Sequence, residues 1–297
     1  MKYVTSHIMG IRLQDFKLLN LGYSLVPNST LNELFNIQAG VNVPTGQYPS
    51  LGYLAIGNGG HTMQVAADGL SYPQLYTHQP GDCALINHIP FVIVPANNDL
   101  SPTQMQLYGM RVPMTVNGVN YVAYYLLKLN LTNTTIQTLE NTVNDGVTTS
   151  VPWVPTTANL HPTPVVASNT GAVSTSGQYL SVQAVITVTL AASDIANILN
   201  VATVLYGNSN LAIISEAALC AGYPLTVSGS AVGGGTVTYT ESIGTILCSS
   251  MSAFYSLPSL NDNLTLTFDV GGAESLYGVS SPSPSPTPTP SPTPTPN

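Results

Sequence analysis

The residue types that could carry out chemistry are concentrated between residues 61 and 100. This stretch holds His61, Asp68, His78, Asp82, Cys83, His88 and Asp99. Four residues separate His78 from Cys83 and Cys83 from His88, a spacing that loosely resembles a zinc site. Structural zinc usually takes four ligands with at least one closely spaced pair, and no such pair is present. We therefore name these three residues only as weak metal candidates, and expect neither a metal nor another cofactor.

The same stretch offers little for catalysis. A Cys83–histidine pair could act as a nucleophile with its base, but neither GxSxG nor HExxH occurs in the chain. The glycine cluster GNGG at residues 57–60 lacks the GK[ST] sequence that a phosphate-binding loop requires, and indicates a tight turn. We expect histidines that bond locally or touch a neighbouring subunit, and no enzyme; a metal-dependent hydrolase stays as the alternative.

The segments that carry these residues have the sequence of loops and short strands. Pro73, Pro80 and Pro90 interrupt the stretch, and residues 41–60 are rich in glycine and proline. We expect the loops of residues 41–100 to form a contact surface.

Capping signals on either side predict short helices. Thr30 and Glu33 have the spacing of a capping box. Ser101 and Gln104 repeat that spacing, with Pro102 at the first helical position.

Strand patterns dominate the rest of the chain. Residues 119–131 carry an aromatic stripe, and residues 178–190 alternate between apolar and polar side chains, as a half-buried strand does. Residues 210–223 form an apolar run around a lone Glu216. Ser193 caps a short helix with the sequence DIANILN. Further strands are predicted at residues 202–206, 211–219, 235–240, 243–248 and 264–270.

A proline-rich segment divides the chain into predicted domains. Residues 151–166, VPWVPTTANLHPTPVV, hold four prolines, which do not fit a strand ladder. We predict a mainly β protein of two β-rich, sandwich-like domains with a few short helices. An N-terminal domain of strands and short helices covers residues 1–150, the connector residues 151–166, a β-sandwich-like domain residues 167–278, and a tail residues 279–297.

The tail has its own signature. Residues 281–296 are eight consecutive Ser-Pro or Thr-Pro dipeptides. Such a repeat has nothing apolar to bury and lacks an amide donor at every second residue, which favours polyproline II extending roughly 50 Å at about 3.1 Å per residue. It could be an inert solubilising tail or a tether into a neighbouring subunit.

The composition narrows the range of partners. Charged residues make up 6% of the 297 residues, against roughly 25% in an average soluble domain. Nucleic acid and anionic membranes attract rows of cations, and the five basic residues form no such row. We therefore expect neither partner. The N-terminus lacks the apolar centre of a signal peptide, which predicts that the chain stays in the cytoplasm where it is made.

Several stretches resemble virion structural proteins of tailed bacteriophages. ISEAALC at residues 214–220 is similar to a pattern in tail-fibre and baseplate-associated proteins, with Ala218 where that family usually has glycine. YLAIGNGGH, PFVIVPANNDLSPTQMQLYGMR and NYVAYYLLKLNLTN, at residues 53–61, 90–111 and 120–133, resemble uncharacterised virion proteins. The tail is similar to tracts of cyanobacterial proteins, which implies a cyanophage.

The resemblance implies a structural role and no catalytic residue. We expect a component of the baseplate or fibre-attachment region of a phage tail, assembled in the host cytoplasm into the virion. It would form homo-oligomers and contact other virion structural proteins. A neck, collar or capsid-decoration protein and a carbohydrate-binding adhesion module remain the alternatives.

Overall fold

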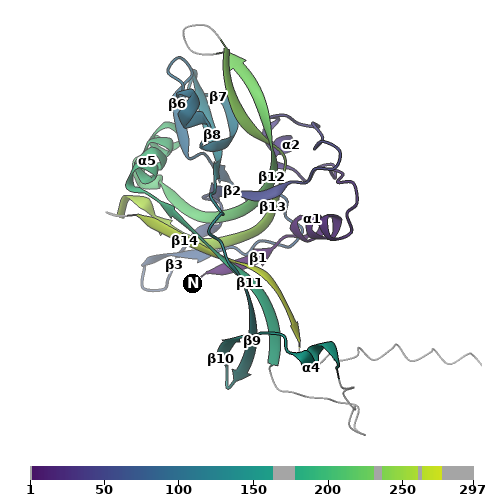
Figure 1. Cartoon of the computed structure of the whole chain (residues 1–297). Helices are drawn as coiled ribbons and strands as arrows, with labels where there is room; N and C mark the ends of the chain where they lie inside the picture. The colour runs from purple at the N-terminus through teal and green to yellow at the C-terminus, as the bar shows by residue number, and fades with distance from the viewer. Residues whose placement is uncertain (1, 163–177, 231–235, 260–262, 276–297) are drawn as a thin grey trace, which may run out of the picture. The chain divides into compact units, whose positions relative to one another are not determined.

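The computed structural model describes residues 2–162, 178–230, 236–259 and 263–275 (Figure 1). As predicted, the fold is mainly β, with several antiparallel sheets and short helices. The helices are α1 (Ile8–Leu18), α2 (Leu31–Phe35), α3 (Pro102–Met105), α4 (Thr157–Leu160) and α5 (Ala192–Tyr206), with 3-10 turns η1 (Ser209–Leu211) and η2 (Leu257–Ser259). None of the helices in the described ranges has the length and apolar character that a membrane crossing requires. The predicted polyproline tail lies outside the described residues.

The strands are distributed along the whole described chain. They are β1 (Tyr3–Ser6), β2 (Ser50–Gly57), β3 (His61–Val65), β4 (Ser71–Leu75), β5 (His88–Ile89), β6 (Val92–Pro95), β7 (Tyr108–Val116), β8 (Val119–Lys128), β9 (Ile136–Asn144), β10 (Val147–Pro152), β11 (Gln178–Leu190), β12 (Ile213–Ser230), β13 (Thr236–Ser256) and β14 (Leu264–Ser275). The strands predicted at residues 119–131 and 178–190 are confirmed as β8 and β11.

The chain forms two units, and neither is continuous in sequence. One consists of Met1–Asn133 and Ile186–Phe268, the other of Thr134–Val185 and Asp269–Asn297. The predicted division at residues 151–166 is therefore wrong, because β12 and β13 lie in one sheet with β2 and β8. Proline marks the end of β10 instead, at the edge of a sheet, where a missing amide donor is tolerated.

The larger unit is built on an eight-stranded antiparallel sheet. Its order is β1-β13-β12-β2-β8-β6, and β5 and β7 pair with β2 and β8 respectively. β12 and β13 are 18 and 21 residues long and run side by side as the longest ribbons of this sheet (Figure 1). The sequence predicts a break after residue 240, but β13 continues, because Gly244 adopts a φ of +58° within an irregularity of the strand pairing.

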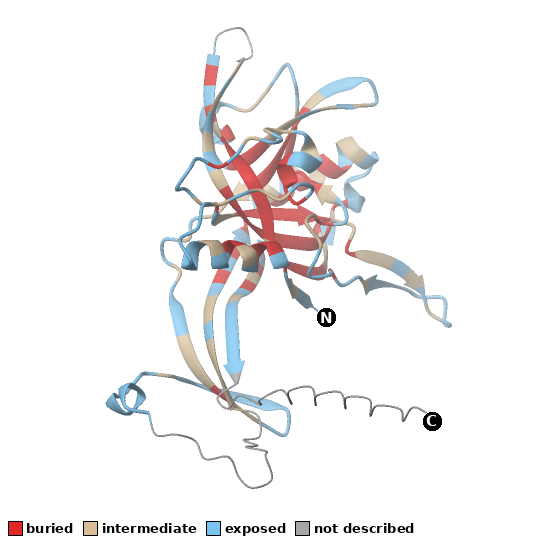
Figure 2. Cartoon of the chain, turned by 90° about the vertical axis from the view of Figure 1, so that its right-hand side faces the viewer, coloured by how far each residue is buried: buried red, intermediate tan, exposed pale blue. Residues whose placement is uncertain are grey.

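Helices cover both faces of this sheet. Ala218 of β12 belongs to one core cluster with Leu31 of α2 and Val201 of α5. Ala221 of the same strand belongs to a second core cluster with Met9 of α1. Figure 2 shows buried residues along the strands between these helices. Strands buried on both faces lose the alternation of polar and apolar residues, which explains the apolar run of residues 210–223.

Two segments differ from the sequence-based prediction. Residues 202–206, predicted as a strand, form the end of α5. They continue the helix because Val201 and Ala202 extend the buried stripe that Ile195 and Ile198 begin. Residues 50–57, predicted as part of a loop surface, form the central strand β2.

A four-stranded sheet has the order β10-β9-β11-β14. The smaller unit holds β9, β10 and the parts of β11 and β14 up to Val185 and from Asp269. Within the described residues of this unit, Asn141 is the one that is buried. The Asn141 amide accepts a hydrogen bond from Ser150 of β10 at 2.7 Å and donates one to Ser181 of β11 at 2.9 Å. A polar ladder thus joins three of these strands.

Candidate functional site

Glu216 is a carboxylate in the middle of the large sheet, with only 1% of its surface exposed. Its Oε1 accepts hydrogen bonds from the backbone amides of Gly59 at 2.7 Å and Asn87 at 3.2 Å. Its Oε2 accepts from the amide of Ile86 at 2.7 Å and from His78 Nε2 at 2.9 Å. Both oxygens are therefore satisfied, as a buried charge requires.

His78 links this carboxylate to a second one. Its Nδ1 lies 3.1 Å from Asp82 Oδ2, whose side chain is 39% exposed, while the imidazole itself is buried. Burial alone would lower the pKa of His78, but the hydrogen bonds to Glu216 and Asp82 together raise it. Burial would likewise raise the pKa of Glu216, and the bonds from His78 and the amides lower it. We therefore assign an imidazolium between two carboxylates.

Three glycines leave the space that Glu216 occupies. A Cβ on Gly57 or Gly59 would lie 2.9 Å from Glu216 Oε1, and one on Gly60 would lie 2.5 Å from Glu216 Cγ. The amide of Gly60 also donates to Ser215 Oγ at 3.0 Å. The GNGG cluster is thus a close contact between backbone and carboxylate. We call Glu216, His78, Asp82 and the segments of residues 57–60 and 86–87 the Glu216 clamp.

A second histidine adjoins the clamp. His7 Nε2 and Ser250 Oγ are 2.8 Å apart, and the His7 ring centroid lies 6.0 Å from that of His78. Burial and the charge of His78 lower the pKa of His7, which favours its neutral form. A hydroxyl beside a neutral imidazole has the composition of a nucleophile–base pair. Since His7 and Ser250 are 0% and 1% exposed, a substrate could reach the hydroxyl only if the surrounding strands separated.

The three weak metal candidates do not converge. His78 belongs to the clamp, whereas His88 Nε2 accepts a hydrogen bond from the Leu85 amide at 3.0 Å, and burial lowers the pKa of His88 to about 4. Cys83 Sγ lies 3.6 Å from the Gly81 carbonyl oxygen, and burial raises its pKa. Within the described ranges, no three His, Cys, Asp or Glu side chains are grouped to hold a metal ion.

The two remaining aspartates of the 61–100 stretch serve separate contacts. Asp99 Oδ2 pairs with Arg111 Nη2 at 2.6 Å, and its Oδ1 accepts from the Tyr124 hydroxyl at 2.6 Å. Asp68 accepts from the amide of Leu70 in a turn. Neither aspartate is part of the clamp.

The sequence singles out Glu216 but not its partners. The available signal was a single carboxylate in a strongly apolar strand, which when buried has to be paired. His78 precedes it by 138 residues, and nothing in the sequence distinguishes His78 from the other histidines as that partner.

The clamp gives an expected pH dependence. A histidine whose pKa rises on folding stabilises the protein fully below its ordinary value of 6.5, and this contribution is lost as the pH rises through the folded pKa. A glutamate whose pKa falls on folding stabilises above its ordinary value of 4.5 and loses this contribution as the pH falls through the folded pKa. Both residues therefore contribute their full stabilisation between pH 4.5 and pH 6.5.

Folding shifts the pKa of other histidines in the opposite direction to that of His78, so the effect of His78 has to be measured as a difference between a variant and the natural chain. The pKa values of His7 and His88 are lowered, which removes stability as the pH falls. We expect the loss of unfolding free energy in His78→Gln, relative to the natural chain, to be largest near pH 6 and to shrink as the pH rises from there through the folded pKa of His78. Urea unfolding across this range measures it. A loss that stays constant with pH would contradict a charged His78.

Residues 1–283 match the family described as "Family of unknown function (DUF7208)". No curated protein and no solved structure matches the chain. All residues of the Glu216 clamp lie within the matched range.

Proposed function

Since the chain belongs to the DUF7208 family, whose description names no function, we propose one from its site: a structural component of a tailed-phage particle, acting by protein–protein assembly and not by catalysis. The proposal rests on the hydrogen bonds of Glu216 and His78. Their polar atoms are consumed by one another, by Asp82 and by backbone amides. Such a site holds three chain segments together, and the polar atoms of Glu216 and His78 are not free to contact a substrate.

The phage assignment rests on the resemblance of particular segments. YLAIGNGGH and ISEAALC lie on β2 and β12, which pair with Gly57 opposite Glu216. Two of the resembling segments thus supply residues 57–60 and Glu216 to the clamp, which supports a shared structural role. We propose the baseplate or fibre-attachment region of the tail as the location, with a neck, collar or capsid-decoration position as the nearest alternative.

The surface supports assembly with copies of itself and with other virion proteins. With 6% charged residues, little like-charge repulsion keeps copies apart. The end of α1 and the residues after it expose Leu18, Leu19 and Leu21, by 83%, 63% and 50%. Neighbouring apolar side chains of this kind are common where proteins associate.

The test combines two measurements. Light scattering of the purified chain is expected to show a defined oligomer, and mass spectrometry of purified particles of the phage that encodes it is expected to detect it in several copies. A monodisperse monomer that is absent from the particles would refute the proposal.

A further inference from the structure

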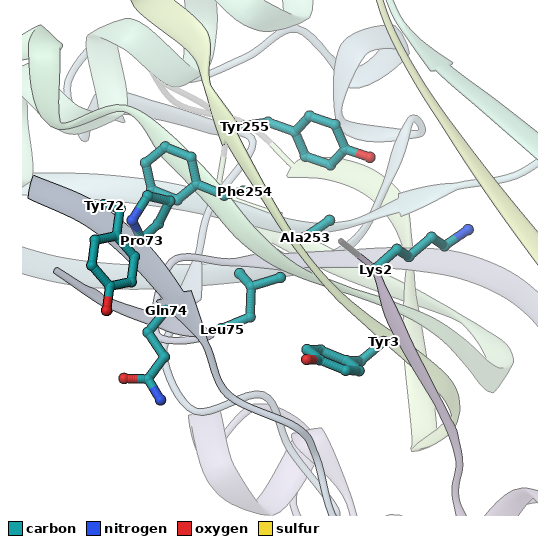
Figure 3. A pocket seen from close by; sticks show the side chains of 9 residues that line it. All are labelled: Lys2, Tyr3, Tyr72, Pro73, Gln74, Leu75, Ala253, Phe254 and Tyr255. Atoms are coloured by element: carbon teal, nitrogen blue, oxygen red, sulfur yellow. The ribbon is translucent and has the colours of Figure 1, made fainter. Parts of the chain in front are cut away.

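An open groove lies beside the end of β13 in the larger unit. Its volume is about 790 Å³. It is lined by Lys2, Tyr3, Tyr72, Pro73, Gln74, Leu75, Ala253, Phe254 and Tyr255. These residues come from the N-terminal segment with β1, from β4 and from β13, and Figure 3 shows Tyr72, Pro73 and Phe254 grouped at one side with Leu75 and Ala253 beside them. The Glu216 clamp contributes no residue to this groove.

The lining combines aromatic rings with hydrogen-bond donors. Tyr3, Tyr72, Phe254 and Tyr255 supply the rings. The hydroxyls of Tyr72 and Tyr255 and the Gln74 amide can donate, and Lys2, the one charged residue of the lining, donates to the Thr267 carbonyl. No carboxylate lines the groove. It therefore suits an apolar ligand that carries acceptors and few donors.

The C-terminal sequence of this chain has that chemistry. Within residues 281–296 every second residue is proline, which has no backbone donor but keeps its carbonyl acceptor. Proline-rich segments in polyproline II dock into aromatic-lined grooves with little loss of conformational entropy, because the extended form is already populated. The proline rings of such a segment pack on the aromatic rings of the groove, and its backbone carbonyls accept hydrogen bonds from the donors of the groove.

We propose that this groove binds the Ser/Thr-Pro tail, residues 281–296, of a second copy of the chain. Sixteen residues reach roughly 50 Å in polyproline II, enough to extend to a neighbouring molecule. Eight nearly equivalent dipeptides also offer several binding registers, which raises the effective concentration of the tail at the groove. The tail is then the tether between copies. This inference deepens the assembly function proposed above.

A synthetic, fluorescently labelled peptide with the sequence of residues 280–297 tests the binding by anisotropy. The receptor is the full-length chain with its eight tail prolines replaced by alanine, so that its own tail does not compete; its unfolding midpoint is compared with that of the natural chain. Saturable binding is expected, and a peptide with alanine at the proline positions is expected not to bind.

Matched receptor variants locate the binding. Tyr72→Ala is expected to weaken it by about ten-fold or more, because aromatic anchors dominate such contacts. Tyr76→Ala is the control, since Tyr76 follows β4, is 45% exposed against 50% for Tyr72, and does not line the groove. It is expected to change the affinity by less than about two-fold.

Three results would overturn the proposal. They are no saturable binding, equal binding of the alanine peptide, and equal affinity of the Tyr72→Ala receptor. Tyr72-dependent binding of an oligosaccharide without peptide binding would also overturn it and assign the groove to a sugar.

The second copy is tested separately, with the natural chain. Its association in light scattering is expected to weaken when the tail prolines are replaced by alanine; peptide binding without this change would overturn the role of a second copy. Particle composition does not enter these measurements, so the groove and the virion assignment can fail independently.

Discussion

Replacing Glu216 by glutamine is expected to lower the free energy of unfolding by about 3–5 kcal/mol, the usual effect of breaking a buried ion pair from one side. The amide would place a donor where three backbone amides and His78 converge, and the imidazolium would lose its buried partner. Unfolding in urea, followed by circular dichroism, measures the loss.

Two further variants isolate the cause. Glu274→Gln removes one negative charge at an exposed position of β14 and is expected to change stability by less than about 0.5 kcal/mol. The double variant Glu216→Gln with His78→Gln is expected to lose less than the sum of the single losses, because the two residues contact each other. A loss below about 1 kcal/mol in Glu216→Gln would mean that the ion pair between Glu216 and His78 does not stabilise the sheet.

The parts of the fold that local chemistry determines were predictable. The capping boxes at Thr30 and Ser101 are present, and both start helices as predicted. Alternation correctly gives the limits of β11, where Ile186, Val188 and Leu190 are buried. In each case the signal and the structure it determines lie within a few residues of one another.

The errors come from contacts between residues far apart in the chain. β2 lies in a segment whose glycines and prolines resemble loop sequence, yet it is central because β12 pairs with it from Gly57–Glu216 to Ser50–Gly222. The proline-rich segment of residues 151–166 indicates a domain boundary, although the chain returns to the larger unit at Ile186. Neither the pairing of β2 with β12 nor the return of the chain to the larger unit has a local sequence signal, since the register of a strand pair is set by both strands together.

In the candidate site, too, the sequence indicates single residues but not the contacts between distant ones. The residue types around residues 61–100 drew attention to His78, but its spacing with Cys83 and His88 suggested a metal, and the structure gives all three different partners. The function of the GNGG cluster was also hidden, because the reason for those glycines is Glu216, more than 150 residues later.

Substituting Gly60 by alanine is expected to destabilise the larger unit by about 3 kcal/mol or more, at the upper end of what overpacking causes. The new Cβ would lie 2.5 Å from both Glu216 Cγ and the Ser215 carbonyl oxygen. A carbonyl of the paired strand cannot rotate away as a long side chain can, so the segment of residues 57–60 would have to leave the clamp.

Gly81→Ala is the control, because a Cβ there meets no atom within 4 Å and the residue has no positive φ. It is expected to change the free energy of unfolding by less than about 0.5 kcal/mol. Equal stability of the Gly60→Ala and Gly81→Ala variants would refute the close packing of residues 57–60 on Glu216. If Gly60→Ala is destabilising but Glu216→Gln is not, the clamp acts through packing alone, and the paired charges of Glu216 and His78 contribute nothing net to stability. If both are destabilising, the glycines and the ion pair are two requirements of one contact, because side chains at residues 57, 59 and 60 would keep the Gly59 amide from reaching the carboxylate.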